Sequence, residues 1–280
     1  MRVTRVEPDM NEVVGRDDLL FVTLDTLRWD VAHELHAAGR LPNLARVLPA
    51  EGFERRHTPG SFTYAAHQAF FAGFLPTPAT PGRHPRLFSL RFSGSETTSP
   101  RTCVLDAADL VHGLAERGYA TACIGGTGFF NLENPLGCVL PGLFAERWWS
   151  RELGVTDPRS TEHQVDRALE IRARIPGLLF LFLNVSALHQ PNRHYLAGAS
   201  VDSRESHAAA LEYVDGQLGR LFDALARRAR RTFCIVCSDH GTAYGEEGFV
   251  GHRLAHAVVW DVPYAHFFVG ASSDRRGTAD

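Results

Sequence analysis

The chain has 280 residues, of which 44% are hydrophobic and 22% are charged, with a formal net charge of −3. These values are ordinary for a soluble globular protein and show none of the basic excess typical of nucleic-acid binders. The N-terminus is polar, without the apolar segment of a signal peptide, and no window reaches ~18 uninterrupted apolar residues. The sequence therefore predicts a cytoplasmic protein without a membrane partner.

Short apolar runs alternate with amphipathic segments along the chain, at the lengths expected of strands and helices. The expected strands are 19–24, 118–125, 178–183, 232–237 and 265–270. The expected helices are a stretch ending near residue 38, and 42–48, 63–72, 106–117, 161–175 and 207–229. Apolar strands without polar alternation, each followed by a helix, predict an α/β fold with a single doubly wound, mostly parallel sheet flanked by helices.

This domain is expected to occupy residues 19–270, between a polar extension at 1–18 and a polar tail at 271–280. Residues 74–102 are rich in Pro, Gly, Ser and Thr and predict a long excursion with one hairpin, which could face a substrate as a flap. Residues 129–159 are expected to be irregular.

Five cysteines are spread along the chain. Cys234 and Cys237 form a CxxC pattern, but they lie within an apolar run and not at a turn between a strand and a helix. We therefore expect buried thiols in a reducing compartment rather than a redox or zinc site at this pair.

Asp239 and His240 stand side by side just after the strand predicted at 232–237. One carboxylate oxygen and one imidazole nitrogen suit Zn²⁺ or Mn²⁺, and open α/β sheets bind ligands outside the carboxyl ends of their strands. Asp25 and His189 follow two other predicted strands in the same way. Asp25 can be either a ligand or the N-cap of the helix that follows it.

Thr63 opens the predicted helix 63–72, which a glycine, Gly73, closes. A hydroxyl at this place can cap the helix. It can also be a nucleophile in the phosphate cradle formed by the unpaired N–H groups of the helix N-terminus. The local pattern by itself favours capping.

Three motifs together resemble those of the alkaline phosphatase/sulfatase superfamily. The segment 24–30, LDTLRWD, is similar to the opening segment of nucleotide pyrophosphatases/phosphodiesterases and sulfatases. Thr63 stands ten residues before Gly73, which is the distance from the nucleophile to the glycine of these families. SDHG at 238–241, with His252 beyond it, resembles the pattern of phosphoethanolamine transferases.

The resemblance implies a site for one or two divalent metal ions, with the ligands Asp25, Thr63, Asp239, His240 and His252. Zn²⁺ and Mn²⁺ are the first expectation, and Mg²⁺ and Ca²⁺ are alternatives. It also implies that Thr63 attacks phosphorus and forms a phosphothreonine, which water or an acceptor alcohol then resolves. Two-metal members of the superfamily carry an Asp near the place of Asn184, so the resemblance supports the first metal site better than a second one.

The resemblance also implies that three histidines and one arginine lie on the side of the site that faces the substrate. His189 and His252 match histidines that bind the transferred group or protonate the leaving group, which makes them catalytic candidates. His67 takes the place of an arginine four residues after the sulfatase nucleophile, and Arg253 follows His252. We expect His67, His189 and Arg253 to contact the substrate.

Two departures from the sulfatase pattern favour phosphorus over sulfur. The nucleophile position holds Thr63 and not the Cys or Ser that becomes formylglycine, and the segment 24–30 has one Asp where sulfatases usually have two. The sequence therefore predicts a hydrolase or transferase of a small phosphorylated substrate. The alternatives are a sulfuric-ester hydrolase of the same fold and a non-catalytic member that binds a ligand or a partner.

Overall fold

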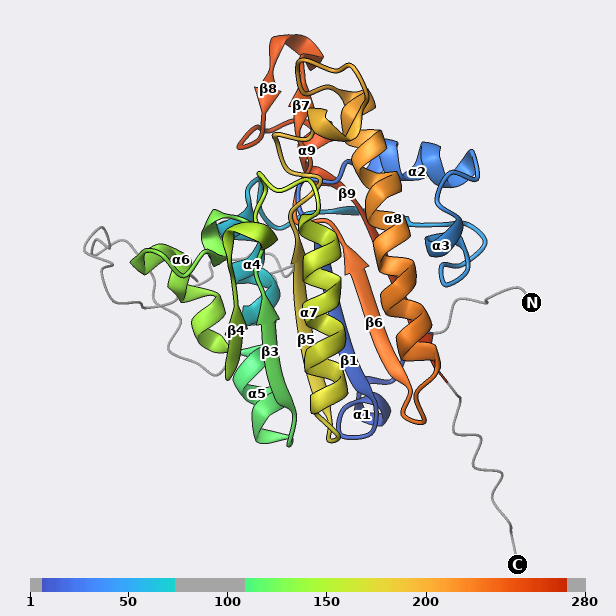
Figure 1. Ribbon diagram of the computed structural model, residues 1–280, viewed down its shortest axis with the longest axis vertical. Coiled ribbons are helices and arrows are strands. Elements are labelled where there is room, and N and C mark those ends of the chain that lie inside the picture. Colours follow the sequence, from blue (N-terminus) through green and yellow to red (C-terminus); the bar gives the residue numbers. More distant parts are fainter. Residues whose placement is uncertain (1–6, 74–108, 271–280) are drawn as a thin grey trace, which may run out of the picture.

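The computed structural model describes residues 7–73 and 109–270. A seven-stranded sheet runs through the molecule in the order β2-β9-β6-β1-β5-β3-β4, with helices on both of its faces (Figure 1). The strands from β6 to β4 are parallel, whereas β9 and β2 are antiparallel to their neighbours. The sheet strands are β1 (Asp18–Leu24), β2 (Glu54–His57), β3 (Ala120–Ile124), β4 (Glu146–Trp148), β5 (Leu179–Val185), β6 (Thr232–Cys237) and β9 (Asp261–Val269). The predicted α/β architecture is confirmed.

The connections between these strands contain helices of very different lengths. The α-helices are α1 (Met10–Val13), α2 (Trp29–Ala37), α3 (Pro42–Ala45), α4 (Thr63–Ala72), α5 (Leu110–Glu116), α6 (Pro135–Val139), α7 (Ser160–Arg174), α8 (Arg204–Ala226) and α9 (Ala257–Trp260). Short 3₁₀ turns are η1 (Gly128–Phe130), η2 (Pro141–Leu143), η3 (Arg151–Leu153), η4 (Arg193–Tyr195) and η5 (Glu246–Gly248), and a small hairpin consists of β7 (Ala243–Tyr244) and β8 (Val250–Gly251). No helix within the described ranges has the length and apolar character to cross a bilayer.

Two hydrophobic cores lie on opposite faces of the sheet, because successive strand residues point in opposite directions. Leu20 and Val22 of β1 pack with α2, α3, α7 and α8, whereas Phe21 packs with Phe182 and residues of α4 and α5. All residues of β1 and β5 are buried, which explains why both strands are apolar apart from Asp18, Thr23 and Asn184. Truncation of the fully buried Phe182 to alanine is expected to cost about 3–5 kcal/mol of folding free energy.

Cys234 and Cys237 belong to these two different cores, because residues three apart in a strand face opposite sides. Both thiols are buried and free, and burial raises the pKa of each. The expectation of buried thiols at this pair is confirmed.

The structure adds two edge strands that the sequence pattern missed and extends a third strand. β2 has the sequence ERRH with mostly exposed residues, and β4 has only three residues, so neither carries an apolar run. β4 and three short helical segments lie within residues 129–159, which were expected to be irregular. β9 begins at Asp261, four residues before the expected strand.

The polar N-terminal extension contains a short helix within its described part. The segment before the first strand contains the turn of helix α1, whose Val13 is 1% exposed and packs in the core of α4 and α5. The flap expected at 74–102, the hairpin within it and the polar tail at 271–280 lie outside the described residues.

Candidate metal centre and nucleophile

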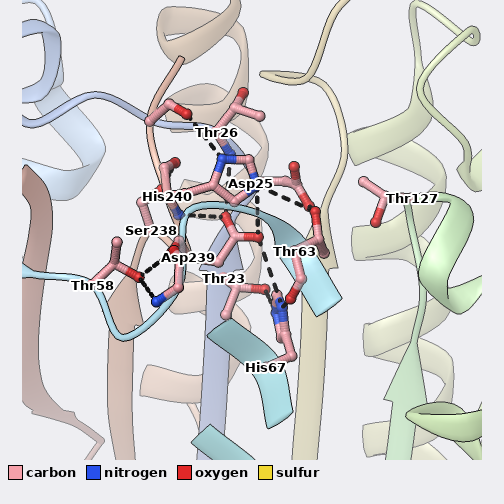
Figure 2. Close-up of polar contacts among 12 residues, drawn as sticks. Thr23, Asp25, Thr26, Thr58, Thr63, His67, Thr127, Ser238, Asp239 and His240 are labelled. Carbon is pink, nitrogen blue, oxygen red and sulfur yellow. Dashed lines mark hydrogen bonds and ion pairs between the residues drawn. The ribbon is translucent and has the colours of Figure 1, made fainter. Parts of the chain in front are cut away.

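Two neighbouring strands bring the predicted metal ligands together. β1 and β6 pair in parallel, so Asp25, directly after β1, meets Asp239 and His240, which follow β6. One ligand atom from each of these three side chains lies within 4.8 Å of the others. All three residues are fully buried, and their side chains converge above the end of the sheet (Figure 2).

Thr63 joins this cluster from the N-terminus of α4 (Figure 2). Its Oγ1 lies 3.4 Å from Asp25 Oδ2 and 3.3 Å from His240 Nε2. The N-cap of α4 is Phe62, without a side-chain capping bond, so the capping role that the local pattern favoured for Thr63 is wrong. The N-cap of α2 is Arg28, and Asp25 therefore does not cap that helix either.

The two carboxylates of the cluster are held in an environment that does not suit two negative charges. Burial, and then the nearby Asp239, raises the pKa of Asp25 from 3.8 to about 6. Burial raises the pKa of Asp239 from 3.8 to about 7. Asp25 Oδ1 and Asp239 Oδ2 are buried without a hydrogen-bond partner among the described residues. A divalent cation would both pair these oxygens and neutralise the charge, so the residues fit a metal ion.

His240 presents the nitrogen that a metal ligand requires. Its Nδ1 lies 2.9 Å from the carbonyl oxygen of Gly241, which can only accept, so Nδ1 carries the proton. The lone pair is therefore on Nε2, which faces Thr63. Burial lowers the pKa of His240 and favours the neutral imidazole. A ligand histidine whose other nitrogen donates to a carbonyl is the usual arrangement in metal sites.

Asn184 holds one carboxylate of the cluster from the neighbouring strand β5. Its Nδ2 donates to Asp25 Oδ2 at 3.1 Å, and its Oδ1 accepts from both the backbone N–H and the hydroxyl of Thr127. Both ends of the amide are engaged, and the end that faces Asp25 is a donor. Asn184 therefore positions the Asp25 carboxylate and does not direct its own oxygen into the cluster.

Backbone contacts fix the second carboxylate. Asp239 Oδ1 accepts from the N–H of Thr26 at 3.2 Å and from the N–H of His240 at 3.0 Å. Thr26 adopts a φ of 65°, in the left-handed region that non-glycine residues rarely occupy. The hydroxyl of Thr58 donates to the carbonyl oxygen of Asp239. Asp239 is thus held by three hydrogen bonds, one of which comes from a residue with a strained backbone.

His67 does not have the predicted contact with substrate. It is fully buried below Thr63, and its Nδ1 donates to the Thr63 carbonyl oxygen at 2.7 Å. Its Nε2 lies 3.0 Å from Thr23 Oγ1, so both ring nitrogens are engaged. Burial lowers the pKa of His67 to about 3, and the ring is neutral. The structure therefore corrects its position to the buried side of α4, where it supports the backbone of Thr63 from beneath.

His189, His252 and Arg253 lie above the buried cluster. The ring of His252 is 4.6 Å from that of His240 and 5.8 Å from that of His189, measured between centroids. Burial and the neighbouring His240 lower the pKa of His252 to about 3. His252 is half-buried and lies beside the group of converging ligand atoms without belonging to it. Arg253 is exposed, with its guanidinium carbon 5.7 Å from the centroid of the Phe62 ring.

A buried arginine that the sequence did not single out anchors the segment after His240. Arg28 is 3% exposed and donates to Asp30 through Nε at 2.9 Å and Nη2 at 2.8 Å. It also pairs with Glu246, beside the β7–β8 hairpin. The neighbouring charges at Arg28 and Asp30 are visible in the sequence, but the partner 218 positions away is not.

Comparisons with known proteins agree with this geometry. The model of the sulfatase family matches residues 17–274. The chain belongs to the sulfatase family. No match to its sequence was found among curated proteins.

Solved structures share the fold at low sequence identity. The C-terminal periplasmic domain of the phosphoethanolamine transferase EptC from Campylobacter jejuni is 14% identical, with a TM-score of 0.61 over 90% of this chain and 79% of that one. The corresponding domain of Escherichia coli EptC, in complex with Zn, is 12% identical, with a TM-score of 0.60 over 90% of this chain and 72% of that one. The lipoteichoic acid synthase LtaP from Listeria monocytogenes is 14% identical, with a TM-score of 0.61 over 99% of this chain and 71% of that one.

Proposed function

We propose that this protein is a metal-dependent hydrolase or transferase of phosphoric esters that uses Thr63 as its nucleophile. One observation carries the proposal. Thr63 does not cap α4, and its hydroxyl faces Asp25 and His240. In this cluster each of the two buried carboxylates has one oxygen without a hydrogen-bond partner among the described residues. A hydroxyl beside a cation site, at the N-terminus of a helix, has the surroundings of an activated nucleophile.

Asp25, Asp239 and His240 would hold the metal, and Thr63 would complete the set. When bound, a divalent ion would lower the pKa of the Thr63 hydroxyl and withdraw electron density from a phosphoryl oxygen. The donor set of two carboxylates, one imidazole and one hydroxyl suits Zn²⁺ and Mn²⁺, with Mg²⁺ and Ca²⁺ as alternatives. The structurally similar EptC domain from Escherichia coli, which is a zinc complex, supports Zn²⁺ as the first ion to test.

Thr63 Oγ1 would attack phosphorus, and the bond from phosphorus to the leaving oxygen would break. Asp25 Oδ2, 3.4 Å from Thr63 Oγ1, is placed to accept the hydroxyl proton. His189 and His252 lie above the cluster, where their N–H groups can donate to the phosphoryl oxygens and to the leaving oxygen. Water or an alcohol would then attack the phosphothreonine and release Thr63.

The substrate is proposed to be a small phosphorylated molecule, and phosphate is favoured over sulfate. A threonine cannot become the formylglycine that the sulfatase reaction uses, whereas its hydroxyl can form a phosphate ester. The similar structures are those of phosphoethanolamine transferases and a lipoteichoic acid synthase. Transfer to an alcohol is therefore proposed beside transfer to water.

The test is turnover of phenyl phosphate, bis(4-nitrophenyl) phosphate and 4-nitrophenyl sulfate by protein supplied with Zn²⁺ or Mn²⁺. We expect turnover of a phosphoric ester and a loss on the order of 10³-fold or more in Thr63→Ala. Arg40→Gln, at an exposed arginine that pairs with Glu212, is the control for handling and folding. Equal turnover by Thr63→Ala and the unchanged protein would refute the threonine mechanism.

Two other outcomes would change the assignment. Faster turnover of the sulfate than of either phosphate would establish the sulfuric-ester hydrolase instead. A metal content far below one ion per chain after purification without chelator, together with no turnover, would support a non-catalytic member of the family.

A further inference from the structure

A cavity of about 390 Å³ opens beside the loop that leads into α4 and Thr63. Its walls are the loop 57–61, which leads into α4, the segment 253–255, and Trp260 at the end of α9. This volume is within the range of about 300–1,000 Å³ that small-molecule sites have.

Each wall of the cavity is tied to a residue of the proposed reaction. Thr58 donates its hydroxyl hydrogen bond to the carbonyl oxygen of Asp239. The backbone N–H of Arg253 donates to the carbonyl oxygen of Ser61 at 2.9 Å, which joins the two loops across the cavity. Ser61 precedes Thr63 by two residues, and Arg253 directly follows His252. These bonds hold the cavity next to the chain segments that carry Thr63 and His252.

Arg253 gives the cavity a positive charge. Its side chain is exposed, and within the described ranges its guanidinium makes neither an ion pair nor a hydrogen bond, with only the Phe62 ring beneath it at 5.7 Å. Its backbone has a φ of 67°, a conformation that glycine adopts without strain. The protein thus has an arginine at a position where glycine would be less strained, and the side chain of arginine ends in a planar cation. Backbone strain of this kind is concentrated at functional sites.

The other wall of the cavity is aromatic. The rings of His57 and Trp260 lie 5.5 Å apart between centroids, inclined by 44° to each other. Trp260 is half-buried, and its carbonyl oxygen accepts from the N–H of Thr58 at 2.8 Å, which fixes it to the loop before the nucleophile. Aromatic faces of this kind bind rings and other flat apolar groups.

We propose that this cavity binds the alcohol portion of the substrate, and that this portion carries a ring and a second anionic group, a carboxylate or a phosphate. The guanidinium of Arg253 pairs with the second anion, and the ring packs against Trp260 and His57. The inference rests on the proposed function, because Thr63 and the metal ligands bring the ester next to the cavity. Arg253 thereby determines specificity and takes no part in the bond change.

The test compares phenyl phosphate with 4-carboxyphenyl phosphate, which differ only in the second anionic group. The variant Arg253→Gly removes the guanidinium and keeps the backbone conformation unstrained. We expect the unchanged protein to prefer the carboxylated ester, and the variant to lose at least tenfold of that preference, measured as the ratio of the two kcat/KM values. Arg40→Gln, which removes an exposed arginine far along the chain, should keep the preference.

Calorimetric binding of both esters to Thr63→Ala protein, with and without Arg253→Gly, separates the subsite from the reaction. If neither ester is turned over but binding selectivity depends on Arg253, the subsite stands and the proposed function fails. If both esters are turned over with equal efficiency, or if Arg253→Gly changes both alike, the subsite is refuted and the proposed function stands.

Discussion

The floor and the rim of the site are built in different ways. The site floor consists of Asp25, Thr63, Asp239 and His240, and each of these residues is at most 3% exposed. The site rim consists of His189, His252 and Arg253, which are half-buried or exposed. The carboxylates and imidazole of the floor stand at the ends of two paired parallel strands, whereas the rim residues lie on loops. The sheet thus fixes the positions of the buried candidate ligands, whereas the rim residues lie on loops, which vary more readily than strands.

The largest effect is expected from a change in the floor. Asp239→Asn keeps the Oδ1 acceptor for the N–H groups of Thr26 and His240 but removes the charge that a metal needs. We expect turnover to fall on the order of 10³-fold or more. In metal-free protein the same change should stabilise the fold by about 1–3 kcal/mol, because a neutral amide replaces a buried carboxylate whose Oδ2 has no hydrogen-bond partner among the described residues. Turnover assays and denaturant unfolding after chelation measure the two effects. A destabilised metal-free variant would contradict this account of the floor.

The pH dependence of the metal-free protein follows from the same carboxylates. Burial raises the pKa of Asp239 from 3.8 to about 7 and that of Asp25 to about 6. Groups whose folded-state pKa is raised stabilise the protein below pH 3.8, and this contribution is lost as the pH rises toward 7. The metal-free protein should therefore lose stability over this window more steeply than metal-free Asp239→Asn. If the unfolding free energies of the two proteins changed in the same way with pH, the raised pKa of Asp239 would be refuted.

A smaller effect is expected one contact away from the floor. Asn184→Ala removes the donor to Asp25 Oδ2, and we expect metal affinity to fall about 10–100-fold, as for other outer partners of metal ligands. Ser186→Ala is the matched control on the same segment, because that hydroxyl donates to the carbonyl oxygen of Leu153 instead. Titration with a competing chelator gives both affinities. Equal affinities in the two variants would show that Asn184 does not orient the ligand.

A still smaller effect is expected from the Arg28–Glu246 ion pair, which anchors the segment after His240. Arg28→Met and Glu246→Gln each break the ion pair that holds the segment after His240. The two changes should be non-additive, with a coupling energy of about 0.5–3 kcal/mol in a double-mutant cycle followed by denaturant unfolding. Additive effects would mean that the pair contributes no coupling, and the hairpin would then need another anchor.

The smallest effect on stability is expected at the hairpin beside the rim. Phe249 and Val250 are 46% and 72% exposed, so Phe249→Ser should change the unfolding free energy by no more than about 0.5 kcal/mol. Thermal unfolding of this variant beside Phe182→Ala contrasts the exposed β7–β8 hairpin with the hydrophobic core. A large loss in Phe249→Ser would show that the hairpin is packed as tightly as the core.

The sequence was sufficient to predict the parallel sheet and the residues of the floor. Asp25, Asp239 and His240 follow apolar runs directly, and parallel strands place such positions at one edge of the sheet. His67 shows the limit of this reasoning. Its spacing of four residues from Thr63 put it on the correct side of the helix, where it contacts the Thr63 carbonyl oxygen, but that side faces the core and not the substrate.

Other features depend on contacts that no local pattern reveals. The Thr127–Asn184 bond joins residues 57 positions apart, and the Arg28–Glu246 pair spans 218 positions. The edge strands β2 and β4 were missed because a strand of three or four residues without an apolar face has no periodic signal. It is therefore easier to predict from the sequence which side chains come together in the cluster than to predict the distant contacts that hold them in place.

The buried chain of hydrogen bonds beneath Thr63 restricts how α4 can pack while the protein folds. Asn184 Nδ2 donates to Thr23 Oγ1 at 3.3 Å, Thr23 is bonded to His67, and His67 donates to the carbonyl oxygen of Thr63. A shift of α4 by one residue would leave several of these polar groups buried and unpaired, at a cost of about 1–3 kcal/mol each. The alternative packings of α4 are thereby disfavoured while the chain folds, and Thr63 reaches the site in one register.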